Sequence, residues 1–438
     1  MAVAQNILWV LVLIGVMILF HELGHYWAAR IFNVRIEVFS FGFGPRLFGF
    51  RRGETDFRVS LVLFGGFVKM AGEQPGEESV TDPRSLLARP RWQRLIIAFS
   101  GPGMNLVLAV VLLTGLFMVK FQKPPEVRAV VGHVFPDSAA ARAGIREGDR
   151  IVGLNDQRDP SWDDVTVKEV AGAGQPLHVL IERNGKQLWT TVTPVFDERT
   201  GLGLAGWQEQ TEIQIVGLSP GMPAQKAGLE RGDVLAAVNG QPIRSRYRLQ
   251  EMIRVAEGRP VEIRYQRQGR EGSLTVQPVF ANPDGGPARW MIGVSMDARV
   301  IITRLSFPEA LRESVVQNVR GASLIYQFLR GIIERRMSAK TLQGPIGIAR
   351  VSGEAAREGP SAFTAWMAIV SLQLAIFNLL PIPVLDGGVI LLLLVEMVMR
   401  RDLSLAVKET VFKLGFVFLM AVVVFALYND ISKMLPAG

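Results

Sequence analysis

The sequence predicts a multi-pass α-helical membrane protein with four transmembrane helices, a membrane-associated β-hairpin and two inserted α/β domains. Three observations support this fold class. Of the 438 residues, 49% are hydrophobic, and the mean hydropathy of +0.25 is high for a soluble protein. The hydrophobic residues are concentrated in four long runs. Between the second and third runs, two segments with an offset of 84 residues repeat the same pattern.

Each apolar run is long enough to cross a hydrocarbon core, which needs roughly 20 helical residues. A cleavable signal peptide is the alternative for the first run. Against it, the segment before the run carries no Lys or Arg, the run is too long, and no small-residue cleavage site follows. We therefore expect a retained first span. The four predicted spans are 7–29, 95–121, 361–399 and 412–427.

The net charge of +8 comes from 48 Lys and Arg against 40 Asp and Glu. Nucleic-acid binding is one reading, but the cations flank apolar runs and form no dense stripe interleaved with aromatic residues. The positive-inside rule instead places the segments after the first and third spans in the cytoplasm. Both termini and the central region then lie on the outer side. The cations after the first span are Arg30, Arg35, Arg46, Arg51, Arg52, Arg58, Lys69, Arg84, Arg89, Arg91 and Arg94. Those after the third span are Arg400, Arg401, Lys408 and Lys413.

The segment 35–70, which follows the first span, alternates between apolar and polar residues as strands do. Four glycines interrupt it and predict bends, because glycine accommodates backbone conformations that other residues resist. We expect two strands that belong to the membrane part of the protein. The glycines are Gly42, Gly44, Gly65 and Gly66.

The central region contains a tandem repeat. Residues 136–149 recur as 220–233, and 191–196 recur as 275–280. In each copy a short helical pattern ends in Ala-Gly and precedes Gly-Asp and an apolar strand, at 150–154 and 234–238. Gly144 and Gly228 fit left-handed positions at helix C-termini. The sequence therefore predicts two similar units, which occupy 126–204 and 205–296.

The motif Ala-Gly-[Ile/Leu]-x-x-Gly-Asp in both copies resembles bacterial PDZ domains, over about 126–296. The resemblance implies peptide binding by addition of a strand to a sheet edge. Residues 201–204 and 292–294 look like the peptide-terminus loops of circularly permuted PDZ units.

An amphipathic pattern runs through 307–337, within the predicted linker segment 297–360. Leu311, Val315 and Val319 lie on one face, and Arg312 and Arg320 lie on the other. A helix on the outer membrane surface is one interpretation. Packing against the repeat units is an equal alternative.

The chain has no Cys and four His, so disulfides and thiolate metal sites are excluded. Within the first span, His21-Glu22-Leu23-Gly24-His25 matches H-E-x-x-H. On a helix, both imidazoles face one metal ion, and the Glu is placed to take a proton from a water on that metal. Ionisable residues inside a membrane span are costly and indicate function. A soluble core helix, mistaken for a span, is the alternative.

A catalytic zinc ion takes three protein ligands. Because the chain has no Cys and its other two His lie in the central region, the third ligand should be a carboxylate. Asp386 is the candidate, because it is the only charge between Glu358 and Glu396 and follows Pro381 and Pro383. The prolines and the Gly pair after Asp386 should break the third helix, and such irregular backbone is tolerated only where protein or a water-filled cavity receives it. Simple capping of the restarting helix is the alternative. Residues 100–105 put small residues at the start of span two, for close helix approach.

These motifs, with tandem PDZ units between them, resemble the site-2 protease family over essentially the whole chain. The resemblance implies a multi-pass metalloprotease of the bacterial inner membrane, with its active site near the cytoplasmic face. It implies Zn²⁺ on His21, His25 and Asp386, with Glu22 as general base. Implied partners are single-span membrane proteins, including an anti-sigma factor trimmed after a first cut, and peptide C-termini at the PDZ units.

The same resemblance implies a substrate-binding role for the hairpin 35–70, whose edge would pair with an unwound substrate. It extends that role to Asn378, Pro381, Pro383, Gly42, Gly44, Gly65 and Gly66. A helix C-cap is an equal reading of Asn378. Two other functions remain open, a membrane-anchored peptide receptor with structural zinc, and an ion transporter, although few other polar residues line the spans. The PDZ pair would either recognise a new C-terminus or act as a size filter.

Overall fold

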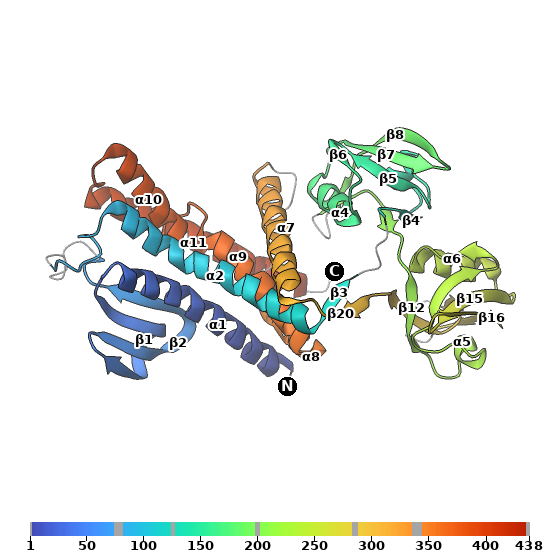
Figure 1. Cartoon of the computed structure of the whole chain (residues 1–438), viewed down its shortest axis with the longest axis horizontal. Coiled ribbons are helices and arrows are strands. Elements are labelled where there is room, and N and C mark those ends of the chain that lie inside the picture. Colours follow the sequence, from blue (N-terminus) through green and yellow to red (C-terminus); the bar gives the residue numbers. More distant parts are fainter. Residues whose placement is uncertain are drawn as a thin grey trace. The chain divides into compact units, whose positions relative to one another are not determined.

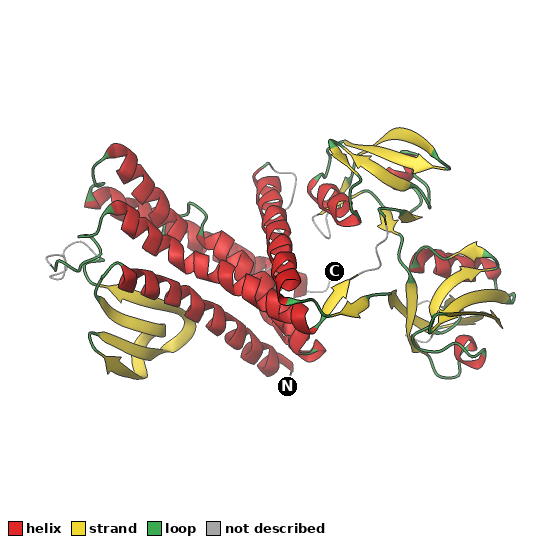
Figure 2. Cartoon of the chain, in the orientation of Figure 1, coloured by secondary structure: helices red, strands yellow, loops and turns green. Residues whose placement is uncertain are grey.

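A computed structural model describes residues 2–73, 82–123, 128–197, 202–282, 288–334 and 344–434. The chain forms two compact units. The first, here called the membrane unit, comprises the N-terminal 120 residues, 304–326 and the C-terminal segment from Lys340. The second, here called the central unit, comprises Phe121–Thr303 and Gln327–Ala339. Strands are confined to a hairpin in the membrane unit and to the central unit, whereas the rest of the membrane unit is helical (Figure 2).

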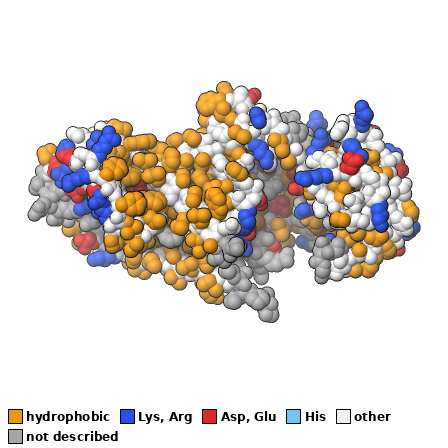
Figure 3. Space-filling model, turned by 90° about the horizontal axis from the view of Figure 1, so that it is seen from below, with side chains coloured by type: hydrophobic (Ala, Val, Ile, Leu, Met, Phe, Trp, Pro, Cys, Tyr) orange, Lys and Arg blue, Asp and Glu red, His pale blue; other side chains and the backbone are white. Residues whose placement is uncertain are grey.

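Four helices in the described residues are long and apolar enough to cross a membrane. They are α1 (Ala2–Ile31), α2 (Arg91–Val119), α9 (Pro360–Asn378) and α11 (Leu405–Met434). Figure 1 shows α1 and α2 side by side. On the face in Figure 3, hydrophobic side chains cover the helical part and charged side chains gather at its left end. A hydrocarbon surrounding fits such a surface.

The third predicted span is two helices rather than one. Helix α9 ends at Asn378, and α10 (Asp386–Met399) begins after a short irregular segment that contains Pro381 and Pro383. Proline lacks the backbone N–H and restricts the residue before it, so the helix stops before the first proline. The predicted break is confirmed.

The core of the membrane unit is formed where α1, α2 and α9 pack together. Leu13 and Met17 of α1 are buried with Leu108 of α2 and Met367 of α9. Helix α11 is different, because only 6% of its apolar window is buried, against 33–39% for the other three spans. Side chains on most of α11 are therefore left for lipid.

The predicted hairpin is present. Strand β1 (Ile36–Arg52) pairs antiparallel with β2 (Thr55–Met70), with several register shifts. Its base packs against the end of α1 through Ile36, Phe39 and Val68. Its outer part exposes apolar side chains, which suits contact with lipid: Leu47, Phe48, Phe50, Leu61 and Val62.

The central unit contains the two predicted repeats. In the first, the sheet order is β6-β5-β7-β8, and β11 (Trp207–Glu209) pairs separately with β4 (Val131–Val134). In the second, the order is β16-β15-β13-β12-β19, so β19 (Val294–Ala298) is an edge strand. Each sheet is covered by its longer helix, α4 (Trp162–Ala171) or α6 (Arg246–Ala256), over its own apolar core.

Several features of the repeats match the sequence-based expectation. The predicted strands coincide with β5 (Arg150–Leu154) and β13 (Val234–Val238). Gly144 and Gly228 have φ angles of 76° and 95°, so both adopt the predicted left-handed conformation.

The remaining strands complete the two sheets and the short ribbons beside them. In the first repeat they are β6 (Gln157–Arg158), β7 (Leu177–Arg183), β8 (Lys186–Val192), β9 (Val195–Asp197) and β10 (Leu202–Leu204). In the second they are β12 (Ile213–Leu218), β14 (Gln241–Pro242), β15 (Val261–Arg267), β16 (Arg270–Val276), β17 (Val279–Ala281) and β18 (Arg289–Met291). Two one-turn helices, α3 (Ala139–Arg142) and α5 (Pro223–Lys226), occupy matching positions.

The amphipathic segment forms helix α7 (Phe307–Ile333), and the last residues of the predicted pattern lie outside the described part. Within the membrane unit, the Ser314 hydroxyl bonds to the Thr114 hydroxyl of α2 at 2.8 Å. Gly321 approaches Leu372 of α9 so closely that a Cβ would lie 2.9 Å from it. This packing against the spanning helices is a contact that neither sequence-based alternative included.

Candidate metal and catalytic site

Helix α1 carries His21, Glu22 and His25 close to one another. Because His21 and His25 are one helical turn apart, their rings lie on one face, and their Nε2 atoms are 3.3 Å apart. The ring centroids are 4.9 Å apart and the planes are nearly perpendicular. The two imidazoles therefore point at one place beside the helix.

Asp386 reaches that same place from a distant part of the chain. Its Oδ2 is 3.1 Å from His21 Nε2, and its Oδ1 is 3.5 Å from His25 Nε2. It is the first residue of α10, and the segment before it folds back over the helix start. A Cβ on Gly387 would lie 2.2 Å from the Leu380 carbonyl oxygen, so the Gly after Asp386 permits this fold.

These three residues have the geometry of a metal site. Their ligand atoms all lie within 4.8 Å of one another, and the three closest separations are 3.1, 3.3 and 3.5 Å. Zinc bonds of about 2.1 Å at tetrahedral angles put ligand atoms about 3.4 Å apart. Two imidazole nitrogens and one carboxylate oxygen are also ordinary zinc donors. The arrangement therefore fits one zinc ion with a fourth position left open.

Groups on α2 orient both imidazoles. His25 Nδ1 lies 2.8 Å from the Ile97 carbonyl oxygen, so Nδ1 carries the proton and Nε2 keeps its lone pair. His21 Nδ1 lies 3.3 Å from the Asn105 side-chain amide. The Asn105 Oδ1 is buried without a partner, and the two ends of an amide are assigned by their hydrogen bonds. Turning the amide over lets Oδ1 accept from the His21 Nδ1–H.

Small residues let α2 approach the histidines. A Cβ on Gly101 would lie 2.2 Å from His25 Nε2, and a Cβ on Gly24 would lie 2.1 Å from the Ser100 carbonyl oxygen. The close approach expected for the small residues at 100–105 is present at Gly101. Asn105 and Ile97 could not be predicted as partners of the histidines, because no local motif joins positions about 80 residues apart.

Glu22 lies between α1 and strand β2. A Cβ on Gly66 would lie 3.1 Å from Glu22 Cγ and 2.8 Å from Ile18 Cγ2. The hairpin therefore passes directly beside the residue expected to act as a base. The close fit explains why Gly is needed at this point in β2.

The structure does not gather the other predicted substrate-binding residues into one cluster. Gly42 is buried with a φ of 96°, whereas Gly44, with a φ of 85°, lies beside open space. Gly65 packs on the Phe43 ring. Asn378 is the last residue of α9, and Pro381 is exposed. Pro383 packs against α11, where a Cβ on Gly415 would lie 2.3 Å from it.

The sequence profile of peptidase family M50 matches residues 9–422, which includes His21, His25 and Asp386. The chain belongs to peptidase family M50. It is therefore a zinc metalloprotease of the site-2 protease type.

Known relatives align with the chain over nearly their whole length. The protease is 30% identical to the regulator of sigma-E protease of Escherichia coli, with 97% of this chain and 98% of the relative aligned. It is 29% identical to a protein of Neisseria meningitidis whose name describes a zinc metalloprotease, with 96% and 97% aligned. Among solved structures, a PDZ domain of an SdrC-like protein from Listeria monocytogenes matches 20% of this chain and 90% of its own, with 17% identity and a TM-score of 0.18.

Proposed function

We propose that the protease cleaves the membrane-spanning segments of single-span membrane proteins. One observation carries this proposal: His21, His25 and Asp386 converge among helices that are long and apolar enough to lie in a bilayer. Ionisable groups at such a place are costly unless they serve a function.

In this proposal His21, His25 and Asp386 would hold zinc. A bound zinc ion would supply Lewis-acid activation of a water molecule and of the peptide carbonyl. Glu22 accepts a proton from the attacking water and is placed to return it to the leaving amide nitrogen. Ile97 and Asn105 keep the Nε2 lone pairs directed at the metal position.

Substrate capture is assigned to the hairpin. A helical substrate hides its peptide bonds in its own hydrogen bonds, so it must become extended before cleavage. An extended segment that adds to β2 near Gly65 and Gly66 would pass beside Glu22, because Gly66 contacts that side chain. We assign Gly42, Gly44, Asn378, Pro381 and Pro383 to the same function.

The excess of cations after the first and third spans places those segments in the cytoplasm. The active site is then near the cytoplasmic face of a bacterial inner membrane, and the repeats lie outside. The similarity to a regulator of sigma-E protease supports an anti-sigma factor as one substrate. The second repeat, which has a cavity beside its edge strand, would then bind the new C-terminus left by a first cut.

A single experiment tests the catalytic proposal. Zinc content and cleavage of a single-span protein lacking its outer domain are measured for the wild type, Glu22→Gln and Asp386→Ala. We expect Glu22→Gln to retain zinc and to cleave at least about 100-fold more slowly. Asp386→Ala should lose zinc. Glu354→Gln, an exposed carboxylate of the same unit, is the matched control. Metal-dependent cutting by Glu22→Gln at the wild-type rate would rule the proposal out.

A peptide receptor is the second candidate function, because the second repeat has a cavity of about 570 Å³ beside an edge strand. That function predicts peptide binding that survives Glu22→Gln. Peptide binding measured in Glu22→Gln, which should not cleave, therefore separates it from the catalytic function.

A further inference from the structure

Each of the two repeats contains a loop with the same hydrogen bond and the same backbone conformation. In the first repeat the Phe135 N–H donates to the Gly206 carbonyl, and in the second the Ser219 N–H donates to the Gly293 carbonyl, both at 2.9 Å. Gly206 and Gly293 have nearly equal φ angles, 80° and 81°. We call the matching segments loop 1 and loop 2; they comprise residues 205–207 and 292–294. The sequence predicted residues 201–204 as the peptide-terminus loop of the first repeat. Loop 1 instead lies directly after that segment, whose first residue, Gly201, is outside the described residues.

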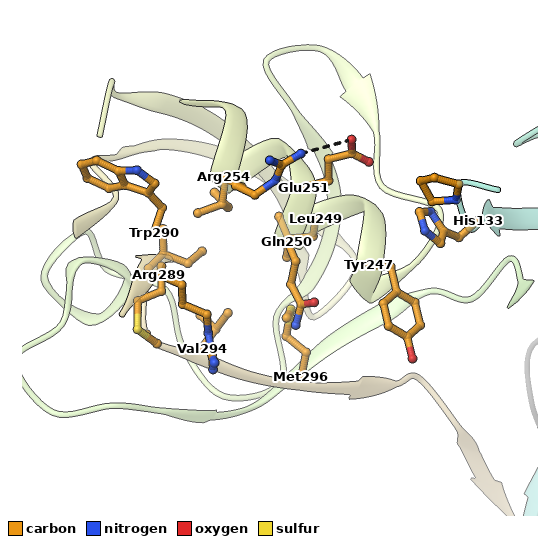
Figure 4. Close-up of a pocket in the computed structure, with 15 residues that line it drawn as sticks. His133, Tyr247, Leu249, Gln250, Glu251, Arg254, Arg289, Trp290, Val294 and Met296 are labelled. Carbon is orange, nitrogen blue, oxygen red and sulfur yellow. Dashed lines mark ion pairs between the residues drawn. The ribbon is translucent and has the colours of Figure 1, made fainter. Parts of the chain in front are cut away.

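Loop 2 opens onto a cavity. Figure 4 shows the cavity between helix α6 and strand β19, with Leu249 and Gln250 on one side and Val294 and Met296 on the other. Ile253 of α6 and all three residues of loop 2 also line it, together with His133 and Pro136 of the first repeat. Backbone N–H groups of such a loop form a site for a peptide carboxylate, and an edge strand accepts a peptide strand.

Loop 1 already holds a carboxylate, and it comes from the same repeat. The Ala205 N–H donates to Glu169 Oε1 at 2.6 Å, and the Trp207 indole N–H donates to Glu169 Oε2 at 2.8 Å. The Gly206 backbone also contributes a hydrogen bond. Glu169 lies on α4 and is only 9% exposed. These are the donors that a peptide carboxylate would use.

The second repeat has no such carboxylate at this position. Glu169 and Ile253 occupy the same place in the repeat, at the offset of 84 residues. Ile253 is buried in the apolar core of the second repeat and has no side-chain atom that accepts a hydrogen bond. The covering helix therefore carries a hydrogen-bond acceptor beside loop 1 and an apolar side chain at the same position in the second repeat.

The space beside loop 1 is also filled. A Cβ on Gly203 would lie 2.4 Å from the Glu169 carbonyl oxygen and 2.9 Å from the Ala173 nitrogen, so β10 lies directly on α4. Trp207 is 2% exposed and packs against Trp162, with ring centroids 6.3 Å apart. In the second repeat β18 packs on α6 in the same way, so the difference between the two loops lies at Glu169.

We propose that Glu169 closes the first repeat by occupying loop 1, so that only the second repeat binds peptides that end in a free carboxylate. An incoming peptide carboxylate would have to displace Glu169 and leave it buried without partners, which is unfavourable. The inference rests on the proposed peptide-binding role of the second repeat and names the loop that performs it.

Hydrogen exchange of the two loops in the full-length protein tests the proposal. The probe is a mixture of hexapeptides with random sequences and a free C-terminal valine, with the amidated mixture as its control. In the wild type, a probe concentration about ten times the dissociation constant should slow exchange at loop 2 about tenfold and leave loop 1 unchanged. In Glu169→Leu, loop 1 should exchange faster without peptide and become protected by the free-carboxylate mixture only.

Two further variants complete the test. Ile253→Glu introduces the same carboxylate into the second repeat and should abolish protection of loop 2. Asp163→Asn, an exposed carboxylate on α4, should behave as the wild type. Protection of wild-type loop 1 by peptide, or unchanged loop 1 exchange in Glu169→Leu, would overturn the closed first repeat. Absence of loop 2 protection would instead reject the proposed peptide-binding role.

Discussion

At the scale of single residues, the histidines of α1 show how much a ligand depends on its neighbours. The H-E-x-x-H motif and Asp386 were identified from the sequence, because local spacing and an isolated charge are visible there. The partners that fix each ring, Ile97 and Asn105, become visible only when α2 is placed against α1. The same holds for Glu169 and Ala205, which no local motif connects.

Replacing Asn105 should weaken zinc binding. Asn105→Leu removes the acceptor for the His21 Nδ1–H, so we expect zinc affinity to fall about 10- to 100-fold. Competition with a chelator on the purified protein measures this. Asn105→Asp keeps an oxygen at that place and should restore most of the affinity. Equal affinity in the Leu variant and the wild type would show that Asn105 has no orienting role.

Glu169 should make the stability of the first repeat depend on pH. Burial raises the pKa of Glu169 above its usual 4.5, and the hydrogen bonds from Ala205, Trp207 and Gly206 only partly oppose this. The folded state then holds the proton more tightly than the unfolded state. The resulting stabilisation is complete below the unfolded pKa and is lost as pH rises through the folded pKa. In Glu169→Gln, the free energy of unfolding should decrease less as pH rises above 4.5. Denaturation curves at several pH values measure this free energy, and an equal decrease in the variant and the wild type would contradict the assignment.

At the scale of elements, helix α11 is attached to the membrane unit at a few points. Lys408 contacts the buried Glu396 of α10 at 2.6 Å. At the other end, Asp430 accepts hydrogen bonds from the backbone N–H groups of Gly344, Ile346 and Gly347 at 2.9 to 3.0 Å. Asp430 thereby caps the N-terminus of α8 (Pro345–Glu358), whose first N–H groups lack partners within that helix.

Removing this cap should loosen the start of α8. Asp430→Ala leaves three N–H groups without their acceptor, and the loss of a cap costs about 0.5–2 kcal/mol. Hydrogen exchange at residues 344–348 should then be about 2- to 30-fold faster. Asp430→Asn keeps one acceptor oxygen, so its exchange rate should fall between those of the wild type and the Ala variant. Unchanged exchange in the Ala variant would mean that α8 does not depend on α11.

At the scale of the whole molecule, the first segment of the central unit, Phe121–Thr303, is an insertion whose ends lie together. Strand β3 (Phe121–Lys123) pairs antiparallel with β20 (Ile301–Thr303), and Lys123 lies opposite Ile301. The chain therefore leaves and re-enters at one place. Each repeat also has its own apolar core, separate from the core of the membrane unit.

The membrane unit should survive removal of the insertion. Joining Lys123 to Ile301 by an Asn-Gly turn closes a two-residue hairpin that the existing register accepts. We expect this shortened protein to bind zinc as the full chain does, because the three candidate ligands lie in the membrane unit. Zinc content per protein is the measurement, and its loss would show that the site depends on the central unit.

The shortened protein also separates the two roles considered for the repeats. A size filter predicts that it accepts substrates whose outer domains are intact. Recognition of a new C-terminus predicts instead that it cuts trimmed substrates poorly. Cleavage of matched trimmed and untrimmed substrates distinguishes these outcomes.

The sequence by itself indicated the apolar runs, the broken third helix, the tandem repeats and the candidate metal ligands, because hydrophobic runs, prolines and short motifs act locally. The tertiary structure decided which groups contact the histidines, that α7 packs on α2 and α9, and that Glu169 accepts hydrogen bonds in loop 1 while a cavity lies beside loop 2. These features depend on atoms brought within 3 to 4 Å from distant positions. Such proximity arises only when helices and strands pack.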